Sequence, residues 1–123
     1  MIPLTGTPAE MFATVQNDPQ SVALDADHVY WSSGVSVMSA AKAGGSPSVL
    51  ASETPQGLLL HITSIVADSG GVFWLYSDAL RHWDGNQAVT LTAGHAHPQN
   101  LLLHSTGIYW VNNNSGAVMK CAR

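Results

Sequence analysis

The hydrophobic and polar positions of the chain repeat one short pattern three times. Residues 98–110 have the pattern of a turn, an apolar strand, a polar turn and a second strand that ends in an aromatic–tryptophan pair. Residues 19–31 repeat this pattern at the same length, and residues 55–74 repeat it with seven extra residues. The repeat therefore has a period of 36 to 43 residues. Such a period, filled with short strands and turns, is typical of β-propeller blades.

Each unit is predicted to form a meander of short antiparallel strands, because apolar runs alternate with turns rich in Gly, Asp, Asn and Ser. The strands expected in the first two units are 22–24, 28–31, 35–38, 47–52, 58–61, 72–74, 79–83 and 88–92. Residues 58–61 match residues 101–104 letter for letter, which places the extra residues of the middle unit after His61, within 62–71. The third unit supplies three strands before the chain ends at Arg123.

These units resemble YWTD-type and related bacterial β-propeller repeats, in which an aromatic–tryptophan pair ends a strand before a polar turn. The pairs that carry the resemblance are Tyr30-Trp31, Phe73-Trp74 and Tyr109-Trp110. The resemblance covers nearly the whole chain. It departs from the family pattern where Thr-Asp would follow, since the chain has Ser32-Ser33, Leu75-Tyr76 and Val111-Asn112 there. It implies an all-β propeller fold, and a binding scaffold more often than an enzyme.

The sequence thus predicts one domain, 1–123, of three propeller blades. Its units cover about 15–51, 52–94 and 95–123, with an N-terminal strand at 8–14. Closed propellers have roughly four to eight blades, so three cannot close a ring. The chain is then either a piece of a longer propeller or half of a six-bladed ring. We favour a homodimer in which strand 8–14 pairs with the partner's last strand, because a lone trio exposes two strand edges and two apolar faces.

Composition narrows the classes of function. Hydrophobic residues make up 46% of the 123 residues, charged residues 10%, and the net charge is −4. Four basic residues give no positive patch for nucleic acid or for a membrane surface. The single cysteine excludes an internal disulfide. Neither a signal peptide nor a transmembrane segment is expected, and the cellular compartment stays open.

Two sets of polar residues recur in the units and are the first candidates for binding. Gln20, Gln56 and Gln99 begin the innermost strands, where two copies of the chain would place six amides around one rim of the channel. His61 and His104 end those strands and could bind a metal or an anion at the other rim. The alternative for the glutamines is turn chemistry with solvated side chains, and the alternative for the histidines is a hydrogen-bonded residue at a strand end.

Two further groups occur once. Trp83, followed by Asp84 and Asn86, resembles the turns of small propeller lectins and suggests a glycan site; the alternative is a core aromatic before a hairpin. His95 and His97 form a His-x-His pair, a weak metal candidate without a third ligand.

No paired carboxylates or nucleophile motif recommend catalysis. The predicted function is a non-catalytic propeller scaffold without a cofactor, which presents a rim to a protein or glycan. The alternatives are a propeller lectin, or a propeller enzyme that uses the channel histidines.

Overall fold

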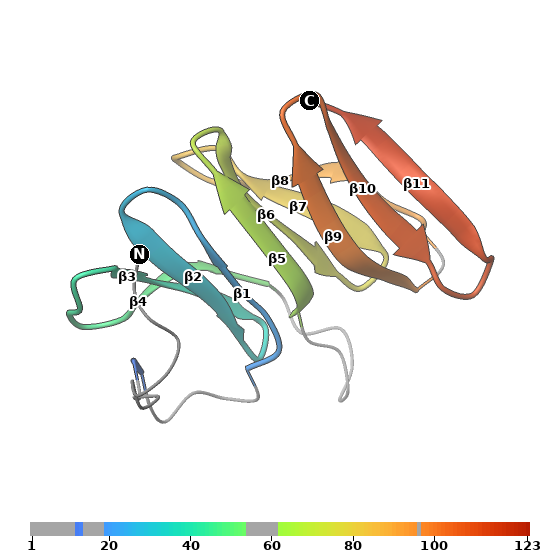
Figure 1. Cartoon of the computed structure of the whole chain (residues 1–123). Coiled ribbons are helices and arrows are strands. Elements are labelled where there is room, and N and C mark those ends of the chain that lie inside the picture. Colours follow the sequence, from blue (N-terminus) through green and yellow to red (C-terminus); the bar gives the residue numbers. More distant parts are fainter. Residues whose placement is uncertain (1–11, 14–18, 54–61, 96) are drawn as a thin grey trace, which may run out of the picture.

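The computed structural model describes residues 12–13, 19–53, 62–95 and 97–123. All regular secondary structure within these ranges is β-strand. The strands form three antiparallel sheets that follow one another as blades (Figure 1). The all-β fold of propeller blades predicted from the sequence is therefore confirmed.

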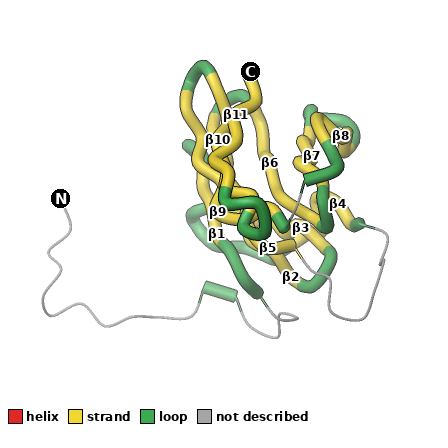
Figure 2. Tube along the Cα trace, turned by 90° about the vertical axis from the view of Figure 1, so that its right-hand side faces the viewer, coloured by secondary structure: helices red, strands yellow, loops and turns green. Residues whose placement is uncertain are grey.

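Each blade is a meander whose strands pair in chain order. Blade 1 contains β1 (Val22–Leu24), β2 (His28–Ser33), β3 (Ser36–Ala41) and β4 (Ser48–Ser52). Blade 2 contains β5 (Ile62–Asp68), β6 (Gly71–Tyr76), β7 (Ala79–Trp83) and β8 (Ala88–Thr92). Blade 3 contains β9 (Pro98–His104), β10 (Gly107–Asn112) and β11 (Ala117–Ala122). In the side view, β1, β5 and β9 gather on one side, away from β4 and β8 (Figure 2).

Blade 3 has three strands among the described residues, so β11 forms its outer edge. The three strands predicted within the third unit are confirmed. Of the strand expected at 8–14, only Phe12 and Ala13 lie within the described residues, and neither is in a strand. The pairing predicted for that strand therefore stays a prediction.

The blades pack through side chains that alternate between the two faces of each strand. In β6, Val72, Trp74 and Tyr76 join a core shared with blade 1, while Phe73 and Leu75 join a second core shared with blade 3. Strands place successive side chains on opposite faces, so a strand between two blades must be apolar on both.

We call the face that carries the tryptophan of a blade its front face and the opposite face its back face. The first core joins the back of blade 1 to the front of blade 2, and the second joins the back of blade 2 to the front of blade 3. The front of blade 1 and the back of blade 3 are therefore the two end faces of the trio.

The position predicted for the extra residues of the middle unit is wrong. The inner strand of blade 2 is β5, whose Asp68 lies opposite Gly71, as His104 lies opposite Gly107 in blade 3. Ile62 and Trp74 are 12 positions apart, which matches the interval in the other blades. The extra residues therefore precede β5. The leucine run at 58–60 has the same letters as part of β9. A run of identical apolar residues does not show which residues face which side of a strand, so it does not fix the position of the inner strand.

Candidate functional site

The residues that end the inner strands are hydrogen-bond acceptors for the turns that follow. Asp25 Oδ1 accepts the backbone N–H groups of Asp27 and His28 at 2.9 and 2.8 Å. Asp68 Oδ1 accepts the N–H of Gly70 at 2.8 Å. In blade 3, His104 Nδ1 lies 3.2 Å from the backbone N of Thr106, which donates to it. The three side chains hold equivalent turns closed.

The predicted equivalence of His61 and His104 is therefore wrong, because Asp68 holds that position in blade 2. His61 itself lies outside the described residues. Local bonds shift the pKa of the two aspartates: the hydrogen bond from Tyr30 lowers the pKa of Asp25, and the hydrogen bond from Arg123 lowers the pKa of Asp68. Both shifts follow from local structural contacts.

The glutamine positions keep only part of the predicted symmetry. Gln20 and Gln99 stand at the start of the inner strands, but register gives the matching position in blade 2 to Thr63. Gln56 lies outside the described residues. Two copies would thus place four glutamines and two threonines around the channel, in place of six glutamines. A binding role for this rim stays a prediction.

The glycan candidate is built into a hairpin. Trp83 packs against the first core, and Asp84 Oδ1 accepts the backbone N–H groups of Asn86 and Gln87, both at 2.8 Å. These backbone hydrogen bonds lower the pKa of Asp84, and the bond from Gln87 has the largest effect. Trp83 is half-buried, whereas Asp84 and the turn residues 85–87 are exposed. The indole and the carboxylate thus serve the fold, and glycan binding stays a prediction.

His95 and His97 serve different contacts. A ring nitrogen of His95, Nε2, lies 2.9 Å from Thr92 Oγ1, and the ring stands edge-on to Trp110 with centroids 5.0 Å apart. His97 is exposed with a left-handed backbone, φ 52°. Within the described ranges, no three His, Cys, Asp or Glu side chains form a group that could hold a metal ion.

Sequence reasoning missed a hydrogen bond that recurs between neighbouring blades. Ser21 Oγ in blade 1 accepts the N–H of Ile65 in blade 2 at 3.0 Å. Ser64 Oγ in blade 2 accepts the N–H of Leu101 in blade 3, also at 3.0 Å. Ser64 directly precedes Ile65, whose N–H donates to Ser21, so the same bond recurs from blade to blade. The residue at this position in blade 3 is Asn100, which is exposed and has φ 58°.

Sequence reasoning also missed a buried ion pair between blades 1 and 2. Glu53, just after β4, is 8% exposed. Its Oε2 accepts the indole N–H of Trp74 at 2.7 Å and the Nε–H of Arg81 at 2.8 Å. Arg81 also donates to Thr90 Oγ1 at 2.6 Å. A lone glutamate after a strand carries no sequence signal for these partners, because they come from the next blade.

The two end faces expose the side chains that the internal interfaces bury. On the back faces, Val37 and Leu80 are 0% exposed, whereas Val118 at the same position of blade 3 is 76% exposed. On the front faces, Ile65 and Leu101 are 3% and 8% exposed, whereas Val22 of blade 1 is 66% exposed. Leu24 and Leu102 extend these end faces and are 57% and 66% exposed. These faces are the main candidate site for binding.

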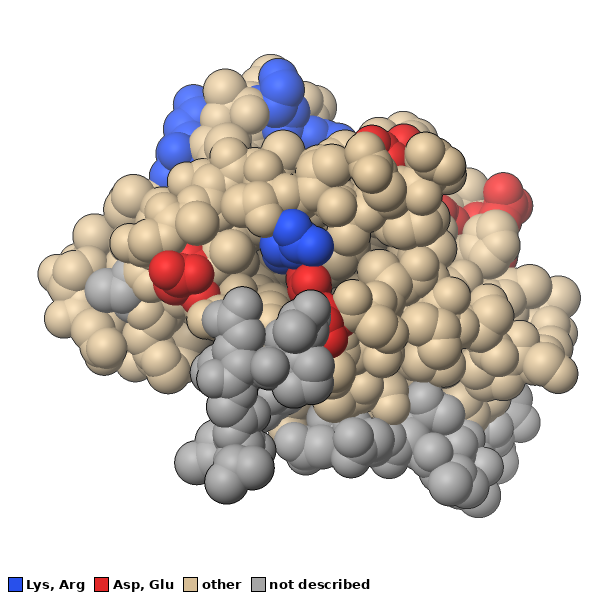
Figure 3. All heavy atoms as spheres, turned by 180° about the vertical axis from the view of Figure 1, so that it is seen from behind, with Lys and Arg blue, Asp and Glu red and all other residues tan. Residues whose placement is uncertain are grey.

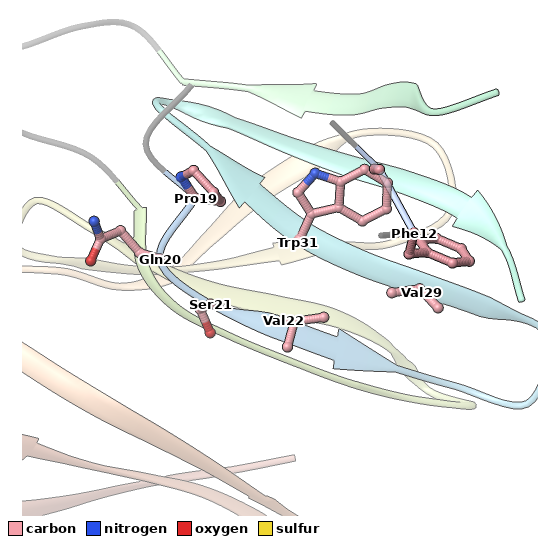
Figure 4. A pocket seen from close by; sticks show the side chains of 8 residues that line it. Phe12, Pro19, Gln20, Ser21, Val22, Val29 and Trp31 are labelled. Carbon is pink, nitrogen blue, oxygen red and sulfur yellow. The ribbon is translucent and has the colours of Figure 1, made fainter. Parts of the chain in front are cut away.

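The front of blade 1 is hollowed beside its tryptophan. A groove of about 460 Å³ is lined there by Phe12, Ala13, Pro19, Gln20, Ser21, Val22, Val29 and Trp31. The rings of Phe12 and Trp31 meet edge to face, with centroids 6.2 Å apart. Val29 lies beside these rings and Gln20 points away from them (Figure 4). The groove is therefore an apolar recess with a polar end.

Charge does not mark a binding patch on the face seen in Figure 3. Charged side chains are few and scattered on the face seen in Figure 3. The part of the chain that the structure describes holds no helix long and apolar enough to span a membrane.

No protein-family model and no curated protein sequence matches the chain. Among solved structures, the chain is similar to a chain from the crystal structure of a nidogen–laminin complex, with a TM-score of 0.74 and 23% identity. That match covers 90% of this chain and 47% of the other, so this chain spans about half the length of its structural neighbour. The likeness supports the β-propeller assignment of the blades.

Two other solved structures also match. Apo AztD from Citrobacter koseri has a TM-score of 0.47 and 8% identity over 85% of this chain and 34% of its own. The computationally designed Ika4 protein has a TM-score of 0.49 and 10% identity over 94% of this chain and 99% of its own. Both TM-scores are below 0.5, which is too low to support a shared fold.

Proposed function

We propose that this chain is a non-catalytic propeller module that binds protein partners through blade faces, and that its first partner is a second copy of itself. The observation that carries the proposal is the exposure of Val22 and Val118 at positions that are buried in both internal interfaces. A contiguous exposed apolar face of this kind is typical of an interaction surface.

Two features support a ring of two copies. The nidogen–laminin structure contains a chain about twice as long as the part that this chain matches, and the fold of this chain matches that part at a TM-score of 0.74. The end faces are also of complementary kinds, one front and one back. A front-to-back contact is heterologous, so it forms a closed ring if the rotation closes and an open filament if it does not.

The non-catalytic part of the proposal is supported by what the polar groups already do. Asp25, Asp68 and Asp84 have lowered pKa values, and each accepts backbone N–H groups in a turn. Enzymes shift pKa values by arranging groups around a cleft. Here Asp25 lies in blade 1, and Asp68 and Asp84 lie in blade 2. Each pKa shift follows first from a local contact: the hydrogen bond from Tyr30 for Asp25, the bond from Arg123 for Asp68, and turn closure for Asp84.

Light scattering coupled to size-exclusion chromatography tests the proposal. We expect a single species of twice the 13.0 kDa chain mass at micromolar concentration. A monomer that persists at concentrations of tens of micromolar would contradict the ring, and a ladder of larger species would replace it with an open filament.

A further inference from the structure

We infer that the groove beside Trp31 receives the back face of blade 3 from a second copy, in the register that the two internal interfaces already use. This inference rests on the proposed function and adds the contact residues. In that register, Val118 and Leu102 of one copy face Val22, Val29 and Trp31 of the other.

The back-face register follows from the strand pairing of each blade. Val118 lies beside Val111 and one residue before Met119, which faces Trp110. Val37 and Leu80 hold the same place in blades 1 and 2, since each precedes the residue that faces the tryptophan of its blade. Both are fully buried, the first against the front of blade 2 and the second against the front of blade 3. A partner blade would bury Val118 in the same way.

The front-face register follows from the inner strands. Val22 lies opposite Trp31, as Ile65 lies opposite Trp74. Ile65 packs into the first core, and Val22 instead lines the open groove. The occupant of the equivalent space in front of Trp74 is the back face of the preceding blade, which supplies Val37. The groove therefore lacks a neighbouring back face, and the one the trio leaves open is that of blade 3.

The recurring hydrogen bond between blades identifies a polar contact for the same interface. Ser21 and Ser64 accept an inner-strand N–H from the blade that follows them. Asn100 stands at this position in blade 3, directly before Leu101, and its side chain has no hydrogen bond within the described residues. Its amide oxygen can accept the N–H of the partner's Val22, which takes the place of Ile65 in register. The ladder of bonds would then continue around the ring.

Substitutions on the two kinds of surface test this register. Val118→Glu and Leu102→Glu place a charge in the proposed contact, and we expect each to weaken the dimer by about 100-fold or more, because an unpaired charge resists burial. Leu91→Glu is the matched control: Leu91 is also an exposed leucine, 40% exposed, but it lies on β8 of the central blade. The control should dimerise as the unchanged chain does. Dissociation constants come from sedimentation velocity over a concentration series, with circular dichroism to show that each variant is folded.

Asn100 gives an independent test that leaves the apolar contact intact. Asn100→Gly removes the acceptor while keeping the left-handed backbone free of strain, and Asn100→Asp keeps an acceptor oxygen. We expect the glycine variant to dimerise several-fold more weakly and the aspartate variant to match the unchanged chain.

The possible failures are distinguishable. A monomeric unchanged chain overturns the proposed function itself. A dimeric unchanged chain whose affinity is insensitive to Val118→Glu, or equally sensitive to Leu91→Glu, overturns the register and leaves self-assembly standing.

Discussion

Glu53 carries the sharpest prediction about how the blades hold together. Its carboxylate is buried at the interface of blades 1 and 2, where one oxygen accepts hydrogen bonds from the indole of Trp74 and the guanidinium of Arg81. Glu53→Ala removes both. The buried indole N–H is then unpaired, at a cost of about 1–3 kcal/mol. Arg81 also loses a buried partner, but its side chain is 23% exposed and keeps its bond to Thr90, so water offsets part of that loss.

We therefore expect Glu53→Ala to lower the free energy of unfolding by about 3 kcal/mol, the lower end of what breaking a buried ion pair costs. Glu53→Gln keeps a carbonyl oxygen for Trp74 and should cost about half as much. The control is Asp27→Ala, which removes an exposed turn carboxylate and should change stability by less than about 0.5 kcal/mol.

Urea unfolding, followed by tryptophan fluorescence and by circular dichroism, measures these values. All variants are compared at one protein concentration, because self-association would make stability depend on concentration. A loss below about 1 kcal/mol for Glu53→Ala would refute the reasoning. Equal losses for the alanine and glutamine variants would refute the contribution assigned to the Trp74 bond.

Three further changes have measurable outcomes. Arg123→Gln breaks the two-bond pair with the half-exposed Asp68, and loss of this pair should cost about 1 kcal/mol near neutral pH. It also removes the bond that Arg123 Nη1 donates to the carbonyl of His104, whose contribution does not depend on the protonation of Asp68. Because the pKa of Asp68 is lowered from 3.8, the cost of losing the pair should be full above pH 3.8 and disappear as the pH falls through the lowered value. Urea titrations at several pH values measure this cost, and a cost that does not depend on pH would contradict the pairing. Ser77→Gly should raise the free energy of unfolding by about 0.5 kcal/mol, because the backbone of Ser77 has φ 56°. The midpoint of thermal unfolding should then rise slightly, and a lower midpoint would argue against backbone strain at Ser77. Burial and the hydrogen bond to Asp25 raise the pKa of Tyr30 to about 12. The stability that the neutral Tyr30 hydroxyl contributes should therefore be full below pH 10 and be lost as the pH rises toward 12. Phenolate absorbance should show the Tyr30 titration at this raised pKa, and Asp25→Asn should lower the titration midpoint.

The sequence was a good guide to what depends on neighbours along the chain. Hairpins such as β7–β8 follow from local turn chemistry: Asp84 accepts the N–H groups that close the turn, as its Asp-Gly-Asn sequence predicts. The β-branched and aromatic residues of β6 likewise predict a strand, and both of its faces are apolar because each meets a different blade. These parts of the fold could be predicted because the interactions that form them lie within a few residues.

The inner strand of blade 2 shows where such reasoning fails. The match of residues 58–61 to 101–104 rests on identical letters, whereas the structure follows the constant interval between the strand start and Trp74. Asp68 fills the place of His104 because either side chain can accept a turn N–H. A repeat preserves the physical role of a position more strictly than its residue type.

Contacts between blades could not be predicted from the sequence for a different reason. Ser21, Ser64 and Glu53 are ordinary polar residues until the next blade is stacked against them, more than 20 residues along the chain. Their partners are set by the rotation from blade to blade, which no local pattern encodes. The same rotation decides whether two copies close a ring.

Cross-linking tests most directly the claim that the two end faces are the halves of one interface. A chain with Val22→Cys and Asn100→Cys, and with Cys121→Ser to remove the natural thiol, is treated with a short bis-maleimide and analysed by denaturing mass spectrometry. We predict that it converts to a covalent species of two chains, while each single-cysteine variant stays uncrosslinked. Failure to cross-link at concentrations of tens of micromolar, or a ladder of three and more chains, would contradict the closed ring.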